Sequence, residues 1–341
     1  MAALVRAAAA LLLGSALAAC APPAQKVEDK SHLIWPAAPD APRIVFVKEF
    51  SRPDDLGISR GLFQRLADAL FGHDESRLVR PMAVVVAGDI VYVADPGAKG
   101  VHRFDQKDGR YDLIYAKGGA ALASPVGLAL GEAGEVYVSD SALAAVFVIR
   151  PGAKEATQLS LGTALGQPTG IAFDAASGRL FVVDTSAHRV NVFRRDGSLE
   201  SSIGQRGTAE GEFNYPTLIW RTPQGRLYVT DSLNFRIQSF DENGRFLAKF
   251  GGLGDGTGDL PRQKGVATDR YGHIYVVDSL FHAIQIFDDR GRYLLSLGGL
   301  GQERGEFRLP TGLFIGADDK IYVADSYNQR VQVLRYIGGP T

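Results

Sequence analysis

Apolar and polar positions alternate in six segments of this chain that share one short pattern. An aliphatic residue, an aromatic residue, Val and any residue precede an Asp, and the pattern recurs every 44–47 residues. It ends at Asp95, Asp140, Asp184, Asp231, Asp278 and Asp325. Short runs of β-branched and aromatic residues between Gly or Asp turns are typical of antiparallel strands. Helical spacing of apolar residues is missing from these segments, so we predict an all-β fold.

Each repeat contains enough apolar runs for four short strands. In the third repeat, residues 168–173 form a small apolar first strand, the shared pattern forms the second, and a third begins near Val190. The fourth strand ends in Gly, as in residues 246–251. Four-stranded units of this length close best into a β-propeller. We therefore predict six four-stranded antiparallel blades.

Two segments before the first repeat complete this prediction. The sixth repeat stops before its fourth strand, and residues 43–50 alternate as a strand would. An unpaired sheet edge is a liability, so we expect residues 43–50 to complete the last blade. Apolar residues at helical spacing predict one short helical connector over 59–72, which either covers the propeller or docks a partner. The propeller domain is thus expected to span residues 43–341.

The repeats resemble a known family. Residues 325–333 read Asp-Ser-Tyr-Asn-Gln-Arg-Val-Gln-Val, and the first strand of the third repeat reads Pro-Thr-Gly-Ile-Ala. Together with the Gly-x-Ile-Tyr-Val-x-Asp wording, these segments are similar to the NHL repeat, over roughly residues 80–338. The resemblance implies a six-bladed β-propeller. NHL propellers serve mostly as binding platforms and in a few cases as enzymes, so the resemblance alone leaves the activity open.

The N-terminus resembles a bacterial lipoprotein signal. Arg6 is followed by the apolar run 7–13 and then by Leu-Ala-Ala-Cys, which ends at Cys20. The resemblance implies that residues 1–19 are a signal peptide and that Cys20 is lipidated. The Pro-rich residues 20–42 then form a flexible tether. Because Ala21 rather than Asp follows Cys20, the expected location is the outer membrane facing the periplasm, with the lipid as the sole membrane anchor.

The composition excludes some classes of partner and cofactor. The formal net charge is −1 with scattered basic residues, whereas a nucleic-acid-binding protein normally concentrates basic charge. Cys20 is the only cysteine, so an intramolecular disulfide is excluded. Gly-rich loops such as residues 251–256 precede no helix, so they lack the N–H cradle of a phosphate-binding loop. We predict no cofactor, no nucleic-acid partner and a monomeric propeller.

The repeated Asp residues allow two interpretations. As a ring of carboxylates they could bind a metal or another cation. Alternatively, each Asp accepts backbone N–H bonds in its own turn and pairs with an Arg five residues later, which Arg189, Arg236 and Arg330 provide. Repetition in every blade favours the structural role.

Histidines suggest a metal site. His188 and His282 each follow their Asp by four residues in blades three and five. NHL-type amidating lyases place zinc-binding histidines near this face, but catalytic zinc requires three protein ligands and an open position. His102 and His273 are expected on other parts of the blade. Solvated loop residues are therefore the preferred interpretation, and a metal-dependent lyase or hydrolase at the propeller mouth remains the alternative function.

Apolar residues at the loop tips of blades four to six suggest a protein-binding site instead. The predicted partner-binding residues are Leu233, Phe235, Arg236, Leu280, Phe281, Tyr327 and Arg330. Large apolar groups beside Arg residues are the usual components of an interface hot spot. Packing of each side chain on the neighbouring blade is the other interpretation. We expect an exported, lipid-anchored propeller that acts as a protein- or ligand-binding platform in the bacterial envelope, with catalysis undecided and less expected.

Overall fold

The structure is a computed structural model that describes residues 33–37, 39–59 and 76–339. The predicted signal peptide, the lipidation site Cys20 and residues 60–72 of the predicted helical connector lie outside the described residues. Within the described part, the helical elements are four short 3-10 segments: η3 (Pro53–Leu56), η4 (Lys117–Gly119), η5 (Ser232–Asn234) and η6 (Ser326–Asn328). None of the described helices has the length and apolarity needed to cross a membrane.

The described strands form six blades of four antiparallel strands. Blade 1 holds β3 (Ala83–Ala87), β4 (Ile90–Asp95), β5 (Gly100–Asp105) and β6 (Arg110–Ala116), and blade 2 holds β7 (Pro125–Leu130), β8 (Val136–Asp140), β9 (Ala145–Ile149) and β10 (Glu155–Gln158). Blade 3 holds β11 (Pro168–Asp174), β12 (Arg179–Asp184), β13 (Arg189–Phe193) and β14 (Leu199–Ile203), and blade 4 holds β15 (Pro216–Arg221), β16 (Leu227–Asp231), β17 (Arg236–Phe240) and β18 (Phe246–Phe250). Blade 5 holds β19 (Gln263–Thr268), β20 (Ile274–Asp278), β21 (Ala283–Phe287) and β22 (Tyr293–Gly298), and blade 6 holds β23 (Leu313–Ile315), β24 (Lys320–Asp325), β25 (Arg330–Tyr336) and the N-terminal β2 (Ile44–Phe50).

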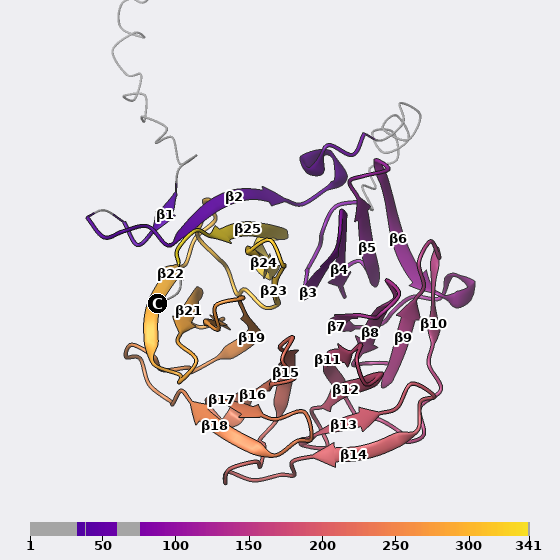
Figure 1. Cartoon of the computed structure of the whole chain (residues 1–341). Coiled ribbons are helices and arrows are strands. Elements are labelled where there is room, and N and C mark those ends of the chain that lie inside the picture. The colour runs from indigo at the N-terminus through magenta and orange to yellow at the C-terminus, as the bar shows by residue number, and fades with distance from the viewer. Residues whose placement is uncertain (1–32, 38, 60–75, 340–341) are drawn as a thin grey trace, which may run out of the picture. The chain divides into compact units, whose positions relative to one another are not determined.

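The blades close into a ring around their first strands. β3, β7, β11, β15, β19 and β23 each contact the next, and β23 contacts β3 (Figure 1). These inner strands surround the axis of the ring, and the later strands of each blade lie progressively outward. The outer strands of blades 1 and 2 are also joined, because β6 and β10 pair in parallel over two residues each. The all-β propeller predicted from the repeats is thus confirmed.

The ring is closed by the N-terminal strand, as the sequence predicted. β2 pairs antiparallel with β25, with Ile44 opposite Tyr336 and Phe50 opposite Val331. The ladder shifts register at Val47, between Phe46 and Lys48. A further strand, β1 (Ile34–Trp35), pairs with β2 and adds a fifth strand to this blade. The sheet therefore begins inside the segment predicted as a tether, because Ile34 and Trp35 extend the exposed edge of β2.

Buried aromatic residues repeat between the blades. The third strand of four blades carries a fully buried Phe, at Phe104, Phe193, Phe240 and Phe287. Phe181, Phe213 and Phe240 belong to one apolar cluster that joins blades 3 and 4. Truncation of such a side chain to Ala typically costs about 3–5 kcal/mol of unfolding free energy. The interblade packing therefore gives the surface loops a rigid frame.

Candidate functional site

The strand register places the repeated Asp residues at one end of the sheets. In blades 3, 4 and 5 the Asp that ends the second strand lies opposite the first residue of the inner strand: Pro168 and Asp184, Pro216 and Asp231, Gln263 and Asp278. The loops that follow the six Asp residues therefore share this end with the loops that lead into the inner strands. We call the surface formed by these two sets of loops the Asp-end face.

The Asp carboxylates are used within their own blades. All six are buried, with 0 or 1% of their surface exposed. Asp140 accepts the N–H of Ser124 from the loop before the inner strand, and its Oδ1 also accepts the N–H groups of Ala142 and Leu143 at 3.1 and 3.0 Å. A carboxylate that binds two separate loops fixes their position on the blade. All six carboxylates accept backbone N–H groups, so this part of the structural interpretation is confirmed.

Asp95 in blade 1 shows how these bonds act on a buried charge. Burial alone would raise the pKa of Asp95, but the nearby His102 ring, whose Nε2 lies 3.5 Å from Oδ2 of Asp95, and the N–H of Val79 outweigh burial and hold this pKa below its ordinary value. The His102 ring is fully buried, and its Nδ1 lies 2.8 Å from the hydroxyl of Tyr111. His102 thus belongs to a structural network rather than to the open face.

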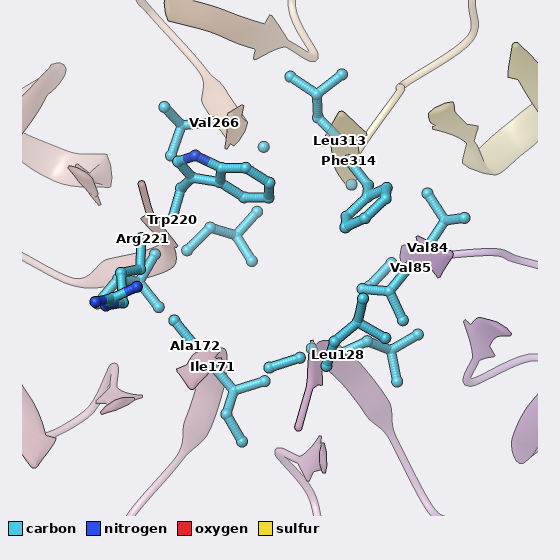
Figure 2. Close-up of a pocket in the computed structure, with 18 of the residues that line it drawn as sticks. Val84, Val85, Leu128, Ile171, Ala172, Trp220, Arg221, Val266, Leu313 and Phe314 are labelled. Carbon is cyan, nitrogen blue, oxygen red and sulfur yellow. The ribbon is translucent and has the colours of Figure 1, made fainter. Parts of the chain in front are cut away.

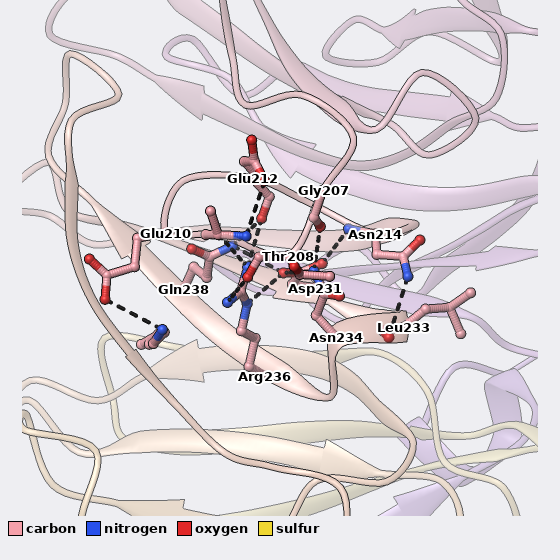
Figure 3. A network of polar contacts seen from close by, with 12 residues as sticks. Gly207, Thr208, Glu210, Glu212, Asn214, Asp231, Leu233, Asn234, Arg236 and Gln238 are labelled. Carbon is pink, nitrogen blue, oxygen red and sulfur yellow. Dashed lines mark hydrogen bonds and ion pairs between the residues drawn. The ribbon is translucent and has the colours of Figure 1, made fainter.

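Arg236 anchors the loop before blade 4 (Figure 3). Its Nε lies 2.7 Å from Oδ2 of Asp231, and Nη1 donates to the carbonyl of Thr208 at 2.9 Å. Nη2 donates to the carbonyls of Ala209 and Glu212 at 2.7 and 2.9 Å. Only 8% of Arg236 is exposed. The guanidinium is therefore committed to the fold, and its predicted role at the partner-binding surface is wrong.

Arg330 repeats this arrangement in blade 6. Its Nε lies 2.8 Å from Oδ2 of Asp325, Nη1 lies 2.7 Å from Oε2 of Glu49, and 8% of the residue is exposed. Arg330 is therefore also unavailable to a partner, for the same reason. In blade 3, by contrast, the described contacts of Asp184 do not include Arg189, whose Nε is buried without a hydrogen-bond acceptor. An Arg five residues after the Asp is therefore not sufficient for an ion pair between the two.

The two loop histidines join neighbouring blades. Nδ1 of His188 accepts the N–H of Tyr215 at 3.1 Å, and Nδ1 of His282 accepts the N–H of Leu309 at 3.0 Å. All four residues have φ between 48° and 54°, a left-handed conformation that costs free energy in non-Gly residues. His188 is buried, so its prediction as a solvated loop residue is wrong. Within the described residues, the structure contains no group of three His, Cys, Asp or Glu side chains placed to hold a metal ion.

The loop-tip residues divide into two groups. Leu233, Leu280 and Tyr327 are 50, 53 and 55% exposed. Phe235 and Phe281 are only partly exposed, and Phe235 has a left-handed backbone at the end of η5. The structure therefore leaves Leu233, Leu280 and Tyr327 accessible to a partner, and it half-covers the two phenylalanines.

Sequence reasoning missed a second set of exposed apolar residues on this face. Leu253 and Leu300 occupy equivalent positions in the loops before blades 5 and 6 and are 70 and 68% exposed. Val79, Leu143 and Tyr215 lie in other loops of the same face. Eight of the fourteen exposed large apolar residues among the described residues are on the Asp-end face. The Gly-Gly-Leu-Gly sequence that surrounds both Leu253 and Leu300 is the pattern from which these exposed residues could have been predicted.

Comparisons with known proteins agree with this architecture. A family model described as NHL repeat matches residues 165–193 and 307–334. A search of the curated proteins finds no match to the sequence. Virginiamycin B lyase from Staphylococcus aureus is similar in structure, with 15% identity and a TM-score of 0.55 over 76% of this chain and 96% of that one. An auxiliary nutrient binding protein from Bacteroides thetaiotaomicron has 13% identity and a TM-score of 0.61 over 78% of this chain and 71% of that one. At these identities the similarity shows the fold alone.

Proposed function

We propose that this β-propeller, two segments of which match the NHL repeat, is a binding platform whose Asp-end face holds a protein partner with an apolar surface. The observation that supports this proposal is the concentration of exposed apolar residues on one face. Leu233, Leu253, Leu280, Leu300 and Tyr327 come from two loop positions that repeat through blades 4 to 6. Single exposed apolar residues are normal, whereas a set held on one surface marks an interaction site.

The rigidity of this face favours binding further. Asp231 and Arg236 tie down the loop before blade 4, and Asp325 and Arg330 do the same for the loop before blade 6. An interface that is already ordered loses less conformational entropy on association. The buried Arg residues thus contribute to binding by holding the loops that carry the apolar side chains.

The proposed location is the bacterial envelope. The Leu-Ala-Ala-Cys segment ending at Cys20 resembles a lipidation signal, and a lipid anchor would keep the propeller at the outer membrane, facing the periplasm. The partner is accordingly an envelope protein.

Site-specific crosslinking in the native envelope tests this proposal. A photoreactive residue replaces Leu253, on the Asp-end face, or Leu294, an exposed residue of the outer strand β22 that serves as the matched control. We expect a discrete protein adduct from position 253 and none from position 294. Substitution of Leu300→Asp in the first variant should abolish the adduct, because a buried unpaired carboxylate opposes apolar association.

Two results would count against the proposal. One is an equal adduct pattern from positions 253 and 294, which would indicate random collision. The other is an adduct from position 253 that persists with Leu300→Asp and Tyr327→Asp together while the propeller remains folded.

A further inference from the structure

The propeller has a second candidate site, separate from the Asp-end face, in the channel that the inner strands enclose. A cavity of about 180 Å³ lies among the inner strands of all six blades (Figure 2). Its lining is mostly aliphatic and aromatic, with Val85, Leu128, Ile171 and Leu313 on different sides. This lining extends from the middle of the inner strands to the end opposite the Asp-end face, where Leu130 and Arg221 are the last residues of β7 and β15.

Two aromatic side chains reach into this channel from blades that are not neighbours. The rings of Trp220, in blade 4, and Phe314, in blade 6, meet edge to face with centroids 6.0 Å apart. Blade 5 lies between them and contributes Gly265 and Val266 to the lining. A Cβ at Gly265 would lie 2.7 Å from the carbonyl oxygen of Thr311, so this stretch of the wall stays small. Both rings are only partly buried, although they stand at the centre of the molecule.

The charged group of the wall is already paired with a counter-charge, although Nε of Arg221 is buried without a hydrogen-bond acceptor. Nη2 of Arg221 lies 2.7 Å from Oδ1 of Asp174, and Nε1 of Trp220 donates to the hydroxyl of Thr268 at 2.9 Å. The positive charge of Arg221 is therefore balanced within the wall. An ionic ligand would gain no unpaired counter-charge from these groups and would lose its hydration on entry. The surroundings favour an uncharged molecule.

The size and chemistry of the channel identify a class of ligand. An engineered apolar protein cavity of about 150 Å³ binds benzene, and the space here is of that size. Partly exposed aromatic rings gain from an additional ring placed at an edge or offset over a face. We propose that the channel binds a small uncharged aromatic molecule in contact with Trp220 and Phe314. This site is independent of the protein-binding role of the Asp-end face.

Trp220 itself provides the measurement. The chain has two tryptophans, and Trp35→Phe leaves Trp220 as the single tryptophan reporter in the full chain. Iodobenzene, an uncharged heavy-atom quencher, is titrated against this variant, with 4-iodobenzoate as its charged counterpart. We expect saturable quenching by iodobenzene and at least about tenfold weaker binding of 4-iodobenzoate. Quenching by iodobenzene that stays linear with concentration would overturn the proposal.

A variant that fills the channel separates binding from collision. Leu218→Phe enlarges a partly buried lining residue, and Leu199→Phe makes the same change on the outer strand β14, away from the channel. In the Trp35→Phe background, we expect Leu218→Phe to weaken iodobenzene binding about tenfold and Leu199→Phe to leave it unchanged. Equal affinities in the two folded variants would refute the site. Should Leu218→Phe fail to fold, Phe314→Leu removes the aromatic partner with a smaller change in volume, and unchanged affinity there would refute the site equally.

Discussion

Replacement of Arg236 by Ala distinguishes a structural Arg from one that binds a partner. The substitution removes the ion pair to Asp231 and all three bonds to the carbonyls of Thr208, Ala209 and Glu212. Asp231 is fully buried and keeps three donors, namely the N–H of Asn214 and the side-chain amides of Asn234 and Gln238, but it loses the cation that balances its charge. The loop before blade 4 loses these three bonds at the same time and keeps those to Gln238 and Asn234.

The expected cost follows from the burial of the pair. Breaking a buried ion pair by removing one partner typically costs about 3–5 kcal/mol of unfolding free energy, because the remaining charge stays buried without compensation. Arg245→Ala is the matched control. Arg245 lies 3.1 Å from Asp241, but its side chain is 79% exposed, and such surface pairs contribute about 0–1 kcal/mol. Arg236→Ala should therefore destabilise the protein several times more than Arg245→Ala.

Equilibrium urea unfolding, followed by far-UV circular dichroism, measures both variants against the parent protein. If the denaturant slope is unchanged, the shift of the midpoint reports the stability difference directly. We expect a large shift for Arg236→Ala and a small one for Arg245→Ala. Similar small shifts for both would refute the structural assignment of Arg236 and would return this residue to the candidate partner-binding surface.

Four further outcomes are expected. Deletion of residues 43–50 should lower the melting temperature far more than deletion of 21–32, because the first removes β2 from blade 6; equal melting would contradict the closure. Cys20→Ser should release the folded protein from membranes in a detergent-partition assay, and unchanged retention would contradict lipidation. Asp95 has a folded-state pKa below its unfolded value of about 3.9, so its contribution to stability is present above about pH 4 and is lost as pH falls through the folded pKa. Asp95→Asn should therefore weaken the dependence of unfolding free energy on acid pH, and an unchanged dependence would contradict this assignment. His188→Ala should reduce stability without changing the metal content measured by mass spectrometry, whereas loss of a stoichiometric metal would restore the metal-site hypothesis.

Local pattern was sufficient for the fold because each blade repeats the same interactions. Both the Asp that ends each second strand and the alternating residues 43–50 reflect contacts that a strand makes with its neighbours in the same sheet. The aromatic residue, the Val and the Asp also keep their spacing in every repeat. A strand shows its buried face in its own sequence, since side chains alternate between the two sides of a sheet. The order of strands within a blade, the closing strand and the structural role of the Asp residues were therefore predictable.

Accessibility was decided by contacts between residues far apart in the chain. The sequence around Arg236 predicts an exposed charge, whereas in the structure the loop that contains Thr208 and Glu212 covers this side chain. His188 is likewise buried, and Tyr215 in the loop before the next blade donates its N–H to the ring.

The central channel depends on the same kind of information. Trp220 and Phe314 are ninety-four positions apart, and they meet because the ring brings blades 4 and 6 together past the small residues of blade 5. The sequence by itself determined which residues form strands and which strands pair, because those preferences act between close neighbours or repeat in every blade. Only the tertiary structure decided which side chains remain exposed and which enclose a cavity, since burial is set by the atoms that closure of the ring brings around each residue.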